Sequence, residues 1–148
     1  MNPTSSLLIS AILLISFSNS ILAIDNPDSP DLIGQLTERE KPFKANITKP
    51  TNGTRDTIRA YHEYKLFLDK ELNKAYALLI SKLSSEHQKE LKVSQRNWIK
   101  FRDAEFELIN NNWSRSNFGS SFVVSRGDYS STIIRNRLIQ LLNYVKNY

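Results

Sequence analysis

The side chains that most suggest chemistry in this sequence are Gln95, Trp98 and Arg102, which stand at i, i+3 and i+7. On a helix of about 3.6 residues per turn they share one face with Leu91. A purely structural helix would place leucine or isoleucine there, whereas an amide, an indole and a guanidinium all seek polar partners. The face is therefore either a paired polar network inside a core or a surface presented to a binding partner.

Burial of Arg102 is acceptable only if its charge is paired. The chain offers four carboxylates as candidate partners: Asp69, Glu71, Asp103 and Glu105. In the favoured interpretation Trp98 fills the core between two helices, Gln95 and Arg102 are paired beside it, and Arg135 is held in the same way from a third helix. In the alternative, Trp98 and Arg102 contact a partner directly.

Catalytic arrangements are missing from the sequence. The chain has no cysteine, and its two histidines, His62 and His87, fall in separate helical stretches. Carboxylate pairs such as Asp69 and Glu71 are two residues apart, which places them on different faces of a helix. We therefore predict that the protein is not an enzyme and that it binds neither a metal nor a cofactor.

Three helical stretches position these side chains. Apolar residues recur every three or four positions from about Thr54 to Leu83, which predicts one long amphipathic helix. Ser85, with a glutamine three residues on, is typical of the start of a second helix, which runs to about Asn112. The apolar positions of Ile133–Val145 predict a third. The expected fold is all-α, a helical hairpin plus a C-terminal helix, and Phe122–Ser125 is the one short stretch that could pair as a strand.

The N-terminal end has a different composition. Met1 to Ile24 carry no charged side chain and include a nearly unbroken apolar run, which predicts a signal peptide over residues 1–23, with a retained membrane anchor as the alternative. No cysteine follows the run, so the protein is not expected to be a lipoprotein, and we expect it in the periplasm or secreted. Spaced prolines and mixed charge predict a flexible tail over residues 24–55, followed by a helical domain over 56–148.

The formal net charge is +5, and it falls on the folded part of the chain. Toward the C-terminus one acidic residue, Asp128, faces five basic residues: Arg115, Arg126, Arg135, Arg137 and Lys146. Such a basic surface suits an anionic glycan or lipid of a cell envelope, while an exported protein is not expected to bind nucleic acid.

Four sequence blocks, in order, resemble the LprI-like family of small exported bacterial proteins. The blocks are Leu72-Asn73-x-x-Tyr76-x-x-Leu79, Leu91-x-x-x-Gln95-x-x-Trp98-x-x-x-Arg102-Asp103-Ala-Glu, Gly119-Ser-Ser and Thr132-x-x-Arg135-x-x-Leu138. The resemblance implies an α-helical, non-enzymatic envelope protein whose activity is inhibition of lysozyme. It also adds Asn73, Tyr76, Asp103 and Thr132 to the expected structural polar-aromatic network.

The chain departs from this family in having no cysteine. Relatives commonly carry one directly after the Arg-Asp-Ala-Glu block, where Phe106 stands here, and another before the Thr-x-x-Arg block. A native disulfide is worth about 2–5 kcal/mol and a buried Phe about 1.5–3 kcal/mol. We therefore expect Phe106 to offset most of the loss by packing against Phe122, Val123 or Tyr129.

Two functions follow from these observations. In the first, the protein blocks the cleft of a lysozyme or another muramidase with the irregular segment Asn117–Tyr129, whose expected partner-binding residues are Ser120, Ser121, Arg126 and Tyr129. In the second, it is a non-inhibitory binding, adhesion or immunity module that contacts another envelope protein, glycan or lipid through the basic C-terminal surface.

Overall fold

The computed structural model describes residues 30–148, all of whose regular elements are helical. They are α1 (Leu32–Ile47), α2 (Thr54–Lys82), α3 (Ser85–Asn112), α4 (Arg115–Phe118), the short 3-10 helix η1 (Gly119–Ser121) and α5 (Phe122–Lys146). The predicted all-α fold, with its hairpin and C-terminal helix, is confirmed. The predicted signal peptide lies outside the described residues.

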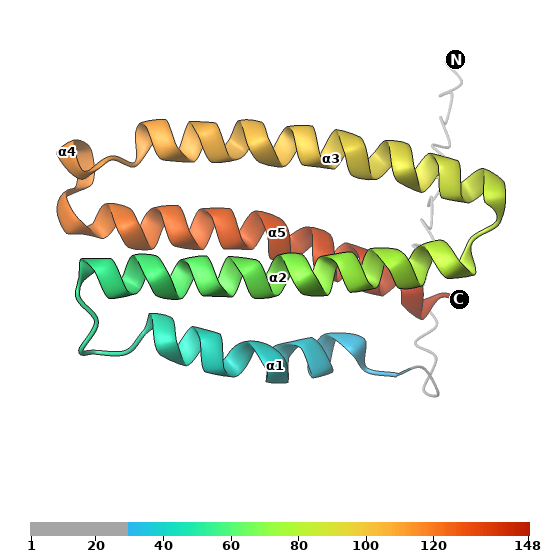
Figure 1. Ribbon diagram of the computed structural model, residues 1–148, viewed down its shortest axis with the longest axis horizontal. Helices are drawn as coiled ribbons and strands as arrows, with labels where there is room; N and C mark the ends of the chain where they lie inside the picture. Colours follow the sequence, from blue (N-terminus) through green and yellow to red (C-terminus); the bar gives the residue numbers. More distant parts are fainter. Residues whose placement is uncertain (1–29) are drawn as a thin grey trace, which may run out of the picture.

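The long helices run up and down beside one another (Figure 1). α2 and α5 point the same way and form the centre of the bundle, while α1 and α3 run in the opposite direction on either side of this pair. The buried core is drawn mainly from the two central helices: Leu68, Leu72, Leu79, Ile134, Leu138 and Leu141. α3 is much less buried, because only Leu91 and Ile109 of its side chains are removed from solvent.

The hairpin of α2 and α3 matches its predicted boundaries closely. One detail differs, because the N-cap of α3 is Ser84 and not Ser85. The Ser84 side chain accepts a hydrogen bond from the backbone N–H of His87 and so satisfies one of the free donors of the first turn. Gln88 closes the turn by donating to the carbonyls of Ile80 and Leu83. None of the described helices is long and apolar enough to cross a membrane.

The prediction of a flexible tail over residues 24–55 is wrong for Leu32–Ile47, which form α1. Asp31 caps this helix by accepting a hydrogen bond from the N–H of Gly34 at 2.7 Å. Leu36 is fully buried, and Phe43 stacks on Phe67 of α2 with 4.5 Å between ring centroids. The helix therefore belongs to the folded domain and covers one side of the α2–α5 pair.

The third long helix begins at Phe122, eleven residues before its predicted start at Ile133. The residues before Ile133 look like a loop in the sequence because many are small and polar. In the structure the buried Gly127 lies against the ring of Tyr61, and the hydroxyls of Ser130 and Ser131 donate to carbonyls one turn back. These small residues let α5 approach α2 closely. The stretch from Phe122 to Ser125 is thus the first turn of a helix and not a strand.

Candidate functional site

A buried carboxylate joins three helices on one side of the bundle. Glu40 of α1 is fully inaccessible to solvent. Its Oε1 accepts hydrogen bonds from Nε of Arg135 at 2.7 Å and from the hydroxyl of Tyr64 at 2.8 Å, and its Oε2 accepts from Nζ of Lys44 at 3.0 Å. The guanidinium of Arg135 is thus paired with a carboxylate. Its partner Glu40 comes from a segment that the sequence predicts to be a flexible tail.

The charges in this cluster stabilise one another. Burial alone would raise the pKa of Glu40, but the hydrogen bonds from Arg135, Tyr64 and Lys44 outweigh that effect and hold the pKa below its ordinary value. Burial and the hydrogen bond to Glu40 raise the pKa of the Tyr64 hydroxyl. The cluster is therefore one anion held by two cations and a neutral phenol. It borders a hollow of about 640 Å³ that Thr132 also lines.

A second polar cluster holds α3 against α5. Arg137 is only 6% exposed, and its Nε donates to the side-chain oxygen of Gln95 at 3.0 Å. Its terminal nitrogens donate to Ser94 at 3.1 Å and to Gln140 at 2.7 Å. Sequence reasoning placed Arg137 only on a basic surface. Its spacing of three residues after the buried Ile134 was the signal that it faces inward.

A third cluster lies between α2 and α3. The Arg102 guanidinium stands over the rings of Trp98 and Phe106, 5.4 Å and 5.8 Å from their centroids, and forms an ion pair with Asp103 at 2.7 Å. Nζ of Lys65 approaches the ring of Phe106 at 5.8 Å. Cations therefore cover both aromatic rings. Phe106 packs against the edge of the core in this cluster, and its predicted contact with Phe122, Val123 or Tyr129 is untested and stays a prediction.

The expected structural network is thus distributed over separate interfaces. Arg135 and Thr132 lie between α1, α2 and α5, whereas Trp98, Arg102 and Asp103 belong to the cluster between α2 and α3. A small hollow of about 300 Å³ brings the remaining three together: Asn73, Tyr76 and Gln95. The structure therefore does not gather these residues into one connected cluster.

The basic C-terminal surface is smaller than the sequence suggested. Arg135 and Arg137 point into helix interfaces, where their guanidinium groups donate hydrogen bonds to Glu40 and Gln95, respectively. Arg126 is turned toward the end of α3. Three of the five basic residues on which the binding-module hypothesis rests therefore serve the fold.

One end of the bundle carries a turn that we call the tip, residues 113–121, formed by α4, η1 and the residue pair before them (Figure 1). Trp113 is its base, and the ring of this residue lies 6.3 Å from that of Phe118 and 5.0 Å from that of Tyr129. Gly119 adopts φ 57° and ψ −139°, a conformation that residues with a Cβ strongly avoid. The glycine of the Gly-Ser-Ser block therefore sets the shape of the tip.

The four predicted partner-binding residues lie at or beside the tip, in two different situations. Ser120 and Ser121 are exposed, and Ser121 donates to the carbonyl of Phe118 at 2.7 Å. Tyr129, on α5, is 46% exposed. Arg126 instead donates to the carbonyls of Trp113 and Asn110, so it fastens the tip to the last turn of α3. Phe118, which is not among the four predicted residues, stands beside the serines and is 45% exposed.

The described residues contain no cluster of three or more histidine, cysteine or acidic side chains that could hold a metal ion. What they present at the tip is a fixed protrusion with hydroxyl groups and aromatic rings. Such a surface can bind another molecule by shape and hydrogen bonding.

One of the comparisons with known proteins finds a match, and it identifies a family. A family model described as "Lysozyme inhibitor LprI" matches residues 47–141, from the last residue of α1 through the hairpin and the tip into α5. Neither the curated proteins nor the solved structures contain a match to the chain. Because the matched span exceeds half of the sequence and contains all four sequence blocks, the chain belongs to the LprI family of lysozyme inhibitors.

Proposed function

We propose that this protein is an exported inhibitor of a peptidoglycan-cleaving muramidase and that its tip enters the cleft of that enzyme. The observation that carries the proposal is the fixed, exposed tip, held by the hydrogen bonds of Arg126 and presenting Phe118, Ser120 and Ser121 to solvent. Membership of the LprI family supports inhibition as the activity. We also propose that the protein is exported to the periplasm or to the medium.

The chemistry of the tip suits a glycosidase cleft. Enzymes of this class use two carboxyl groups that flank the scissile bond. The exposed hydroxyl of Ser120 can donate a hydrogen bond to one of those carboxyl groups. The hydroxyl of Ser121, whose proton goes to the carbonyl of Phe118, can accept one from the protonated carboxyl group, and the ring of Phe118 can occupy the space of a sugar ring. Little ordering is needed on binding, because Trp113 and Arg126 already hold the turn.

Charge narrows the choice of target enzyme. The chain has a formal net charge of +5 at pH 7, so a strongly basic lysozyme would repel it during encounter. An acidic or neutral muramidase, such as one delivered by a competing bacterium, is the target that the charge favours. The protein should accordingly inhibit acidic muramidases better than basic ones at low ionic strength, and added salt should reduce the difference.

A peptidoglycan turbidity assay tests the proposal with a panel of acidic and basic muramidases. We expect the purified protein to slow lysis by at least one acidic enzyme. The variant Phe118→Ser should weaken inhibition about tenfold or more, because truncating a central aromatic contact costs about 2 kcal/mol or more at a protein interface. Gly119→Ala should act in the same direction by deforming the tip, since the strained conformation costs about 1–3 kcal/mol.

The matched control is Phe101→Ser. Phe101 lies on α3, away from the tip, and at 52% its ring is as exposed as that of Phe118 at 45%. Both variants should melt within a few degrees of the unmodified protein, but only Phe118→Ser should lose inhibition. Undiminished lysis by every muramidase tested would refute the inhibitor function. Equal inhibition by the two variants would refute the role of the tip.

A further inference from the structure

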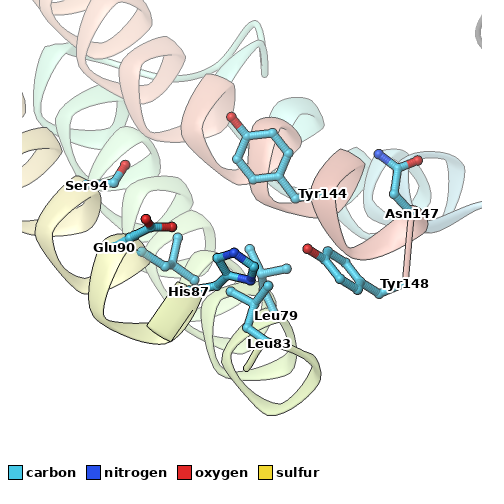
Figure 2. A pocket seen from close by; sticks show the side chains of 9 residues that line it. Leu79, Leu83, His87, Glu90, Ser94, Tyr144, Asn147 and Tyr148 are labelled. Atoms are coloured by element: carbon cyan, nitrogen blue, oxygen red, sulfur yellow. The ribbon is translucent and has the colours of Figure 1, made fainter. Parts of the chain in front are cut away.

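The end of the bundle opposite the tip contains a hollow of about 640 Å³ between the end of α2, the start of α3 and the end of α5. Its apolar lining comes from leucines of the helical hairpin: Leu79, Leu83 and Leu91. Figure 2 shows Glu90 and His87 extending from α3 on one side and the rings of Tyr144 and Tyr148 standing on the other. A volume of this size accommodates a small organic molecule.

Some of the polar groups around this hollow have a hydrogen-bond partner in the described residues and others have none. Nδ1 of His87 pairs with the hydroxyl of Ser84 at 3.2 Å, and the hydroxyl of Tyr144 accepts a hydrogen bond from Gln140 at 2.8 Å. The carboxylate of Glu90 and the hydroxyl of Tyr148 have no hydrogen-bond or ion-pair partner within residues 30–148. The hollow therefore presents a free carboxylate on its α3 side and two phenol rings on its α5 side.

The charge of the hollow is opposite to that of the whole chain. Among the side chains of its lining, Glu90 carries the one carboxylate and none is a lysine or an arginine, whereas the protein carries a net charge of +5. A carboxylate attracts a cation directly, and the faces of Tyr144 and Tyr148 attract it through their ring quadrupoles. The leucines can at the same time remove an apolar group from water.

We propose that this hollow binds a small organic cation, an ammonium or guanidinium group carried on an apolar body. The cation pairs with Glu90 and lies against the ring of Tyr148, and the apolar body rests on Leu79 and Leu83. The site is separate from the tip at the other end of the bundle, so its occupation and the inhibition of a muramidase are independent properties (Figure 1).

An NMR titration of the purified protein with 2-phenylethylammonium tests this site, and 2-phenylethanol serves as the neutral probe of similar shape. We expect the amine to shift the amide signals of Leu91 and Asn147 and to bind about fivefold or more tightly than the alcohol. Glu90→Gln should remove most of this preference. Tyr148→Ala should weaken binding of the amine about two- to fivefold, and both residues are exposed enough for the fold to tolerate the changes.

Glu107→Gln is the matched control, because Glu107 is also exposed on α3 but lies near the tip. It should leave binding of the amine unchanged. Equal affinity for the amine and the alcohol, or unchanged affinity in Glu90→Gln, would overturn the proposal, as would shifts confined to residues outside the hollow. The Glu90→Gln variant should retain full muramidase inhibition, so this site and the proposed function can fail separately.

Discussion

Replacement of Glu40 by glutamine tests whether the buried charge cluster fixes α1 to the bundle. Glutamine keeps the volume of the side chain, but it removes the negative charge and turns an N–H donor toward Lys44 or Arg135. Breaking a fully buried ion pair costs about 3–5 kcal/mol. The side chains of Arg135 and Lys44 remain 27% and 48% exposed, so water compensates part of the loss. We expect a loss of about 2–3 kcal/mol, or about 8–12 °C in melting temperature for a domain of this size.

The assay is thermal and urea unfolding followed by circular dichroism, with Glu38→Gln as the control. Glu38 lies on the same helix and pairs with Lys41, but its side chain is 68% exposed, so its replacement should cost less than about 1 kcal/mol. The double variant Glu40→Gln/Arg135→Gln should lose less stability than the sum of the two single variants, because it removes both charges of the closest pair and leaves only the half-exposed Lys44 without its carboxylate. Equal, small losses in Glu40→Gln and Glu38→Gln would refute the reasoning.

Three further predictions concern stability. The pKa values of Glu40 and Glu71 are lowered by their cationic partners, so the stability they provide is present above about pH 4.3, the ordinary pKa of glutamate, and is lost as the pH falls through their folded pKa values. Urea unfolding between pH 6 and pH 3 should show this loss, and an unchanged free energy would contradict it. The pKa values of Tyr61 and Tyr64 are raised by burial and by their carboxylate acceptors, so their contribution is present below about pH 10 and is lost at higher pH. The double variant Tyr61→Phe/Tyr64→Phe should lose less free energy of unfolding between pH 9 and pH 11 than the unmodified protein does. An equal loss in both proteins would show that these two hydroxyls are not the cause. Gly127→Ala would place a Cβ 2.3 Å from the ring of Tyr61, which should cost about 1–3 kcal/mol in urea unfolding, and a melting temperature equal to that of the unmodified protein would contradict the close approach of α2 and α5.

α1 shows why part of the fold could not be predicted from the sequence. Its apolar residues do follow a helical spacing: Leu32, Ile33, Leu36, Phe43 and Ile47. The position that would complete this face is Glu40, and Pro42 follows it, so the segment has the mixed charge and prolines of a tail. The carboxylate is buried because a cation 95 residues later in the chain reaches it, which no local pattern reveals.

The candidate site, like the fold, could be predicted from the sequence only in part. The Gly-Ser-Ser block identified the tip, because a glycine between helices marks a turn, and Ser120 and Ser121 are exposed there. Arg126 looked equally available for a partner in the sequence. In the structure the free carbonyls at the end of α3 bind its guanidinium, so it supports the tip from within.

The sequence by itself determined the hairpin of α2 and α3 almost to the residue. Apolar residues that recur every three or four positions over a long stretch form an amphipathic helix in water. The sequence also determined the family, through residues such as Trp98 and Arg135. The tertiary structure decided which charged side chains lie inside. A buried charge is stable only where a partner from another helix meets it, and that meeting depends on how α1, α3 and α5 pack around α2.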